Sequence, residues 1–246
     1  MHPFTLPQEA IARAEANRGA AHVFGRLDPV HTALIVIDMQ NYFVAPGYQG
    51  EVPMARKIVP AINRLAAAMR SAGGRVVWVQ NSTNDTRQSW SVVHDHLMTP
   101  ERRERRWATM DQSDPGFQLW HALDVQSGDD RIIKKRYSAF LQGASPIEAH
   151  LRDHGVDMLL FAGTATNICC ESSARDAMML NFKVAMVSDG CAASSDEMHA
   201  ASLHGFYTIF GDVLTVDEAI AGLGVAAIGP LRDRRLSACR TPTDTA

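Results

Sequence analysis

Three side chains of complementary chemistry follow three apolar runs of the sequence: Asp38, Lys134 and Cys169. A lysine beside a cysteine favours the thiolate, and the positive end of a helix dipole does the same, so both are expected to lower the thiol pKa. An aspartate within reach accepts the thiol proton and later delivers it to a leaving amine. Backbone N–H groups at the same helix start can hold an oxyanion. These groups predict an acyl-transfer hydrolase that works through a thioester.

Each of these residues also has a simpler explanation. Asp38 could cap a turn or a helix, Lys134 stands in a short basic run at a strand end, and Cys169 could be a small buried hydrophobe. Their joint placement after three different strands is what favours chemistry. A protein that only binds a small molecule, or a scaffold, is the alternative from another functional class.

The elements that would position these residues alternate between apolar runs and helical patterns. Apolar runs without polar alternation are typical of strands that are covered on both faces. The runs lie near residues 32–38, 75–80, 132–134, 158–161, 184–187 and 212–215. The alternation predicts an α/β fold of three layers (α/β/α) with a central, mainly parallel, Rossmann-like six-stranded sheet. Ligands of such sheets bind outside the carboxyl ends of the strands, where the three reactive residues would meet.

Local signals predict where some of these elements begin and end. Pro60 interrupts a helical pattern over residues 54–71 and predicts a kink or a late helix start. Asp189 and the glycine after it predict a turn behind the fifth strand. The segment 81–130 is expected to hold two or more short helices. Its charge run at 101–106 is expected to be a solvated helix face, with a patch for an anionic substrate or a partner as the alternative.

The domain organisation follows from the same patterns. Residues 1–30 are expected to form an N-terminal extension, with a short surface helix after Pro7 that ends near Gly19. Residues 31–246 are expected to form a single domain, because no repeat or Pro/Ser-rich linker divides them. The polar tail beyond about Gly229 is expected to be loosely held.

Composition excludes several classes of protein. The chain has 246 residues, with 24 Lys+Arg against 27 Asp+Glu and a hydrophobic fraction of 46%. This balance argues against a disordered chain and against a basic nucleic-acid binder. The sequence contains neither a signal-peptide pattern nor an apolar run long enough for a membrane span. Four cysteines stand without zinc or disulfide spacing: Cys169, Cys170, Cys191 and Cys239. We therefore expect a soluble, cytoplasmic protein without nucleic-acid or membrane partners.

Three sequence blocks carry a resemblance to a known family. They are DMQNYF at residues 38–43, KKRYSAF at 134–140 and GTATNIC at 163–169. In order and spacing they resemble the signature blocks of the isochorismatase-like cysteine hydrolases. The resemblance covers about residues 31–224, and three separate motifs in order are specific where one alone would not be.

The resemblance implies that Asp38, Lys134 and Cys169 form a catalytic triad. Lys134 matches the family lysine, three residues before the tyrosine of its block, and the neighbouring Lys135 would face the other side of the strand. Cys169 ends its motif, whereas about 100° of helical turn would point Cys170 elsewhere.

The resemblance also implies a particular backbone at the nucleophile. A non-proline cis peptide is expected between Ala165 and Thr166, and Ala165, Thr166 and Cys169 would then present backbone N–H groups to the oxyanion. Family members are usually homo-oligomers with the site near a subunit interface. A homodimer or a homotetramer is therefore expected.

The branches of this family differ in their nucleophile and in their metal-binding residues. Isochorismatases proper lack the nucleophilic cysteine, so Cys169 argues against that activity. Nicotinamidases carry an Asp-x-His motif and a further histidine for a divalent metal after the second strand. Here residues 80–84 read QNSTN, and His94 and His96 form a pair without a third ligand. We expect no catalytic metal and no cofactor, with a metal-dependent, nicotinamidase-like amidase as the alternative.

Within the family, the residues most resemble the ureidoacrylate amidohydrolase and N-carbamoyl amine amidohydrolase branch. The implied reaction cleaves a terminal ureido or carboxamide group of a small molecule and releases ammonia. A ureido substrate would leave a carbamate, which can lose carbon dioxide. Asn41, Asn81 and Tyr137 are candidates for binding the amide or a remote polar group, with loop capping and interface packing as their structural alternatives. Trp90 and Trp107 are candidates for the pocket lining or for ordinary core.

Overall fold

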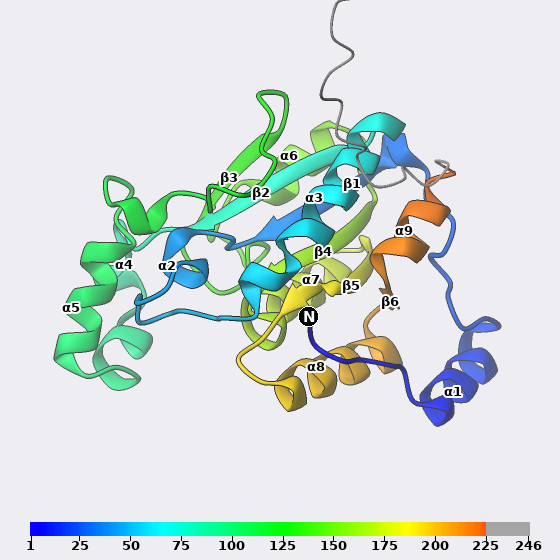
Figure 1. The fold of residues 1–246 in the computed structure, drawn as a ribbon, viewed down its shortest axis with the longest axis horizontal. Coiled ribbons are helices and arrows are strands. Elements are labelled where there is room, and N and C mark those ends of the chain that lie inside the picture. Colours follow the sequence, from blue (N-terminus) through cyan, green and yellow to red (C-terminus); the bar gives the residue numbers. More distant parts are fainter. Residues whose placement is uncertain (225–246) are drawn as a thin grey trace, which may run out of the picture.

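A computed structural model describes residues 1–224, and within them six strands form one parallel sheet (Figure 1). The strands lie in the order β3-β2-β1-β4-β5-β6, and every neighbouring pair is parallel. They are β1 (Thr32–Ile37), β2 (Arg75–Asn81), β3 (Asp130–Lys134), β4 (Met158–Thr164), β5 (Lys183–Ala192) and β6 (Asp212–Leu214). The predicted three-layer fold with its six-stranded sheet is confirmed.

Helices cover both faces of this sheet (Figure 1). One face carries α3 (Ala55–Ala72) and α9 (Val216–Gly222); the other carries α6 (Ile147–Asp153), α7 (Glu171–Met179) and α8 (Asp196–Ile209). Every residue of β1 is buried, because alternate side chains enter alternate layers. Leu34 and Val36 belong to the core under α3, whereas Ala33 and Ile35 belong to the core under α6 to α8. This double burial explains the continuous apolar runs of the sequence.

The predicted turn after the fifth strand was wrong, and so was one of the two outcomes predicted at Pro60. Asp189 and Gly190 lie inside β5, not in a turn, because the strand continues past a bulge where its pairing with β4 shifts between Phe161 and Gly163. The helix α3 begins at Ala55 and continues through Pro60, so the predicted late start does not occur.

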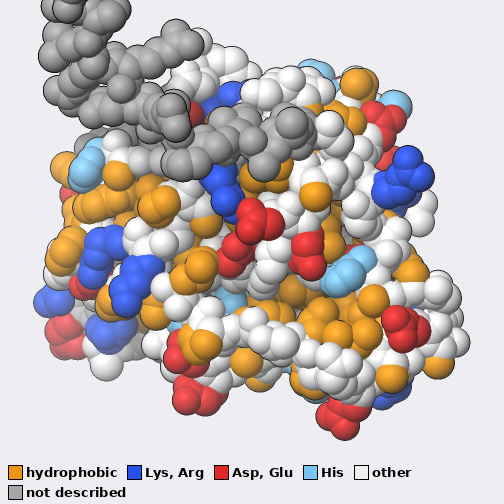
Figure 2. Space-filling model, turned by 45° about the vertical axis from the view of Figure 1, so that its right-hand side comes forward, with side chains coloured by type: hydrophobic (Ala, Val, Ile, Leu, Met, Phe, Trp, Pro, Cys, Tyr) orange, Lys and Arg blue, Asp and Glu red, His pale blue; other side chains and the backbone are white. Residues whose placement is uncertain are grey.

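The segment 81–130 forms short helices beyond the carboxyl ends of the strands, as predicted (Figure 1). They are α4 (Thr86–Ser89), η2 (Val92–His96), α5 (Pro100–Thr109) and η3 (Pro115–Phe117), which lie near α2 (Asn41–Val44). No helix in the described part of the chain combines the length and apolar character needed to cross a membrane. Figure 2 shows acidic and basic side chains interspersed with apolar ones on one face of the molecule.

The N-terminal segment packs on the layer of helices around α8. The predicted surface helix is present as α1 (Gln8–Arg18), and Gly19 ends it in a left-handed conformation. His2 is buried and stacks on His199 of α8 with 4.5 Å between ring centroids. Nδ1 of His199 lies 2.9 Å from the Thr166 hydroxyl, in the loop after β4. The predicted loose tail beyond Gly229, like Cys239, lies outside the described residues.

Gly163 lies where β1 and β4 approach each other, and its replacement gives a test of this packing. Its φ is +116°, and an added Cβ would lie 2.1 Å from the Ile37 carbonyl oxygen. Gly163→Ala is therefore expected to lower the free energy of unfolding by about 3 kcal/mol or more. Thermal unfolding measures this, at about 2–4 °C per kcal/mol for a chain of this size. Gly205→Ala, in an open position within α8, is the matched control and should stabilise by about 0.5–1 kcal/mol. Equal melting temperatures of the two variants would contradict the close β1–β4 approach.

Candidate active site

Asp38 is the first residue after β1 and is fully buried. Its φ is 53°, a left-handed conformation that aspartate tolerates better than most residues. Its N–H donates to the Val79 carbonyl of β2 at 2.8 Å, which fixes the turn at the strand end. Burial raises the pKa of its carboxyl above the usual value, although Lys134 and Cys169 oppose this shift.

Lys134 is the last residue of β3 and is also fully buried. Its Nζ lies 2.9 Å from Oδ2 of Asp38 and donates a second contact of 2.9 Å to the Arg136 carbonyl. Although burial favours the neutral amine, the Asp38 carboxylate and Cys169 raise the pKa of Lys134 above its usual value. The ammonium is therefore charged at neutral pH and compensates the buried carboxylate.

Cys169 lies on the helical turn η4 (Thr166–Cys170), which follows β4 and continues into α7. Cys169 is 5% exposed, and the charges of Asp38 and Lys134 both act on its thiol. Burial and the Asp38 charge raise the pKa of the thiol to about 12, although Lys134 acts to lower it. The predicted lowering of the thiol pKa is therefore wrong, because burial raises this pKa by more than the charge of Lys134 lowers it. The thiol stays protonated at neutral pH and needs Asp38 to remove its proton.

Asp38, Lys134 and Cys169, called the triad below, are thus brought together from three strand ends. Their sequence neighbours lie elsewhere. Lys135 places its Nζ 3.0 Å from Asp85 at the surface, and Cys170 points its Sγ toward the Ala162 carbonyl at 3.9 Å. The geometry therefore separates Lys134 and Cys169 from their chemically similar neighbours.

A non-proline cis peptide is present, but it joins Thr164 and Ala165, one bond before the predicted Ala165–Thr166 position. The strand β4 ends at Thr164, whose hydroxyl donates to the Ala192 carbonyl of β5 at 3.2 Å. Ala165 already starts the helical turn, because its carbonyl accepts the N–H groups of Ile168 and Cys170. The chain thus turns one residue earlier than predicted.

Asn81 lies beside the triad, whereas Asn41 serves a loop. Asn81 pairs with Lys134 across β2 and β3 and is buried. Its Nδ2 donates to the Arg136 carbonyl at 3.1 Å, and its Oδ1 has no partner in the described part of the chain. The Asn41 amide donates instead to the Pro115 carbonyl at 2.8 Å. Of these two candidates, only Asn81 therefore presents an unused buried acceptor at the site.

Tyr137, the third candidate for substrate binding, is half-buried near the triad. Burial raises the pKa of its hydroxyl, on which the charges of Cys169 and Lys134 also act. Its ring packs edge-on against Trp90, with 4.7 Å between centroids. Trp107 lines a cavity of about 530 Å³ whose lining does not include the triad. Both tryptophan rings pack against His94, but Trp90 is the one that contacts a candidate site residue.

Known proteins are similar to this chain in both sequence and fold. The Isochorismatase domain matches residues 32–218, the stretch that supplies the triad. The chain belongs to the isochorismatase family. It is 32% identical to the ureidoacrylate amidohydrolase RutB of Caulobacter vibrioides, over 82% of this chain and 96% of that protein.

Solved structures show the same family fold. A cysteine hydrolase from Pseudomonas syringae pv. phaseolicola has a TM-score of 0.72 and 29% identity, covering 80% of this chain and 94% of that one. An N-carbamoylsarcosine amidase from Thermoplasma acidophilum has a TM-score of 0.61 at 24% identity, over 76% and 96% of the two chains, and supports the fold alone. The protein is therefore an isochorismatase-family hydrolase.

The two histidines considered for a metal do not converge in this isochorismatase-family hydrolase. His94 is buried, and its Nε2 lies 3.2 Å from the Thr86 hydroxyl, whereas His96 is exposed. Burial lowers the pKa of His94. Within residues 1–224, no three His, Cys, Asp or Glu side chains are grouped as metal ligands.

Two buried glutamines at the strand ends were not predicted. Gln40 accepts the Asn81 N–H at 2.7 Å and donates to the Asn81 and Phe117 carbonyls at 3.0 and 2.9 Å. Gln80 donates to the same Phe117 carbonyl at 2.9 Å. They fasten the loop around η3 to β2. The sequence signal that could have revealed them is a glutamine at the end of an apolar run or within three residues of it.

Removing one member of the buried ion pair tests its energetic role. Lys134→Met leaves the Asp38 carboxylate buried without its counter-ion, so the free energy of unfolding should fall by about 3–5 kcal/mol. Urea unfolding at neutral pH measures this loss. Asp38→Asn in the same chain should restore much of it, because the uncompensated charge is then absent. Lys135→Met is the control at a half-exposed neighbour and should change little. An equal effect of the two lysine variants would contradict the pairing.

Proposed function

We propose that this chain is a cysteine-dependent amidohydrolase that cleaves the terminal C–N bond of a small ureido or carboxamide compound and releases ammonia. The observation that carries the proposal is the fully buried ion pair of Asp38 with Lys134 at 2.9 Å, whose two charges act on the buried Cys169 thiol. This arrangement joins a nucleophile, a proton acceptor and a fixed positive charge in one site. The ureidoacrylate amidohydrolase among its relatives supports the substrate class.

In the first half-reaction, Asp38 accepts the thiol proton as Cys169 Sγ attacks the carbonyl carbon of the substrate. The transfer is coupled to attack, because burial keeps the resting thiol protonated. Backbone N–H groups of the turn at Ala165, Thr166 and Cys169 stabilise the oxyanion of the tetrahedral intermediate. When the intermediate collapses, the C–N bond breaks and Asp38 returns the proton to the leaving amine. Ammonia departs and an acyl thioester remains on Cys169.

In the second half-reaction, water attacks the thioester carbonyl and Asp38 takes its proton. The C–S bond breaks, and the proton goes back to the thiolate. An amide yields a carboxylic acid, whereas a ureido compound yields a carbamate that can lose carbon dioxide. Lys134 remains charged throughout and prevents the carboxylate from being left uncompensated in the buried site.

Asn81 and Tyr137 are the side chains that we assign to the substrate. The unpartnered Oδ1 of Asn81 is an acceptor for the N–H groups of a terminal amide. Burying that oxygen without a partner is costly, so a donor from the substrate stabilises the complex. Tyr137 offers a hydroxyl beside the triad. Asn41 has no such role in this proposal, because its amide serves the Pro115 loop.

Replacing the nucleophile tests the reaction class. Cys169→Ala should abolish ammonia release from a panel of ureido acids and primary amides, because no thioester can form. The panel is run with an ammonia assay, and circular dichroism checks that the fold is kept. Cys170→Ala is the control, and its activity should remain within the same order of magnitude as wild type. Full activity of Cys169→Ala would disprove the assignment, and activity lost to chelators and restored by zinc or iron would favour the metal-dependent alternative.

The pH profile tests the role of Asp38. The carboxyl must be ionised to accept the thiol proton, and burial raises its pKa above the usual 3.8. Activity should therefore rise with pH, with its acid midpoint above 3.8. No alkaline decline is expected before the region above 10.5, because the pKa of Lys134 is raised above that value. The measurement is kcat/KM for an uncharged amide, which does not itself titrate. A midpoint below the usual aspartate value would contradict this role.

A further inference from the structure

One arginine of the charged helix α5 is buried, in contrast to the solvated face that the sequence predicted. Arg106 is 6% exposed, whereas its neighbour Arg105 is exposed. Within residues 1–224 the Arg106 guanidinium makes no hydrogen bond and has no carboxylate within ion-pair distance, and its buried Nε has no partner. Its Nε is therefore cut off from water without an acceptor, and a mostly buried guanidinium without an anion carries an uncompensated cost.

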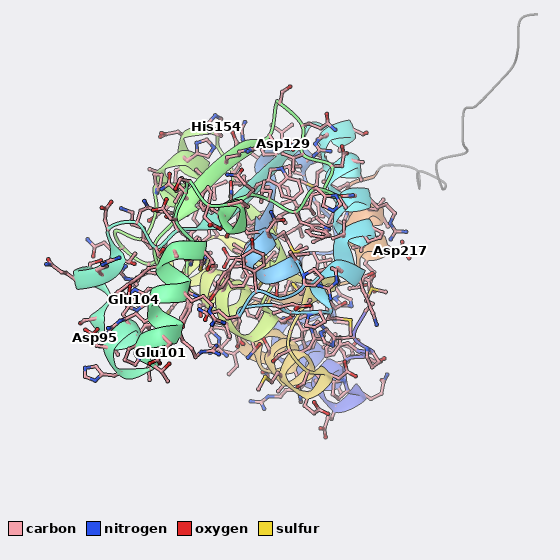
Figure 3. The ribbon with its side chains drawn as sticks, turned by 60° about the vertical axis from the view of Figure 1, so that its left-hand side comes forward. Asp95, Glu101, Glu104, Asp129, His154 and Asp217 are labelled. Atoms are coloured by element: carbon pink, nitrogen blue, oxygen red, sulfur yellow. The ribbon has the colours of Figure 1, made fainter. Side chains whose placement is uncertain are left out.

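The acidic side chains around α5 do not neutralise this charge. Asp95, Glu101 and Glu104 are exposed on η2 and α5 (Figure 3). Asp95 lies 3.0 Å and Glu104 3.9 Å from Arg103, so the acids that pair here take a different arginine. The helix thus keeps its ion pairs at the surface and leaves Arg106 unpaired underneath.

Geometry and charge both place Arg106 beside the active site. The end of its helix is tied to the residues after β2, because the Thr83 N–H donates to the Met110 carbonyl at 3.3 Å. Its Cζ lies 5.6 Å from the ring centroid of Tyr42, which belongs to α2 directly behind the Asp38 turn. Its charge acts to lower the pKa values of Asp38 and Cys169, and also that of Tyr137. Three groups of the site, Asp38, Cys169 and Tyr137, thus lie within range of the Arg106 charge.

The charges of the site do not balance without a ligand. The Asp38 carboxylate is already paired with Lys134 at 2.9 Å, and the Cys169 thiol is neutral. Arg106 therefore adds one positive charge to a buried site that is otherwise neutral. A carboxylate is the small anion that best matches a guanidinium, because two parallel N–H···O bonds join the planar groups.

We propose that Arg106 binds a carboxylate of the substrate, so that the enzyme acts on ureido or amide compounds that carry a second, acidic group. The inference rests on the proposed amidohydrolase function and narrows its substrate class. The acid end of the substrate lies under α5 while its carbamoyl end lies at Cys169. Arg106 thereby selects acidic substrates and orients the carbonyl toward the nucleophile.

Matched substrates and matched variants test this role. The substrates are 3-ureidoacrylate and 3-ureidopropionate, each compared with its uncharged methyl ester. In wild type, kcat/KM for each acid should exceed that for its ester by about tenfold or more. Arg106→Gln should lower kcat/KM for the acids by about 10- to 100-fold, mainly through KM, and change the esters by less than about threefold.

Two control variants separate binding from folding. Arg105→Gln removes the same charge from the exposed neighbouring position and should keep the wild-type preference for acids. Arg106→Lys keeps the charge without the bidentate geometry, so it should retain part of that preference. Thermal unfolding of all variants shows whether the fold is intact. An acid preference that persists in Arg106→Gln, or equal losses for acids and esters, would overturn the inference.

A binding measurement separates this inference from the proposed function. Calorimetry with 3-ureidopropionate is carried out on Cys169→Ala protein, with and without Arg106→Gln. If wild type releases no ammonia from any compound, the proposed reaction fails. Binding of the acid but not of its ester, lost with Arg106→Gln, would still support the carboxylate site. Absence of binding, or binding unaffected by Arg106→Gln, would overturn it.

Discussion

The buried ion pair between Asp38 and Lys134 is the interaction on which the site depends. Neither charge is tolerable alone in a fully buried position, and together they are held at 2.9 Å. Asp38 directly follows β1 and Lys134 ends β3. These strands are not neighbours, so β2 must lie between them in the correct register. The pairing of Asn81 with Lys134 sets that register, and Gln40 ties it to the turn after β1. A one-residue slip of β3 would turn Lys134 to the other face.

The nucleophile Cys169 follows β4, which pairs with β1 on the side opposite to β2. In the order β3-β2-β1-β4-β5-β6, the first three strands are added toward one edge of the sheet and the last three toward the other. Ligands of such sheets bind at the switch point between β1 and β4. Gly163 allows β4 to pass close to Ile37, directly before Asp38. The close approach of β1 and β4 and the placement of the carboxylate and the thiol at their ends are therefore parts of one arrangement. The helices α4 and α5 then cover the strand ends and add Arg106 from outside the sheet.

Strong local patterns account for the part of the fold and the site that the sequence predicts. Each strand is buried on both faces, so its apolar run is visible without structure, and reactive residues behind such runs are placed by topology alone. The bulge that extends β5 past Asp189 depends on pairing with β4 and leaves no local signal. The burial of Arg106 could not be predicted for a similar reason. Nothing in the charge run at 101–106 distinguishes a buried arginine from an exposed one. The thiol pKa was misjudged because burial, which decides it, is a property of the assembled site.

The burial of Cys169 has a consequence for chemical resistance. Peroxides and alkylating reagents react with thiolates, and exposed thiolates are oxidised to sulfenic and sulfinic acids. A thiol whose pKa is about 12, in a residue that is 5% exposed, offers these reagents almost no anion. The thiolate character needed for attack develops only when a carbonyl carbon is in place to receive the sulfur. A nucleophile kept neutral at rest is thereby protected from oxidants during the intervals between substrates.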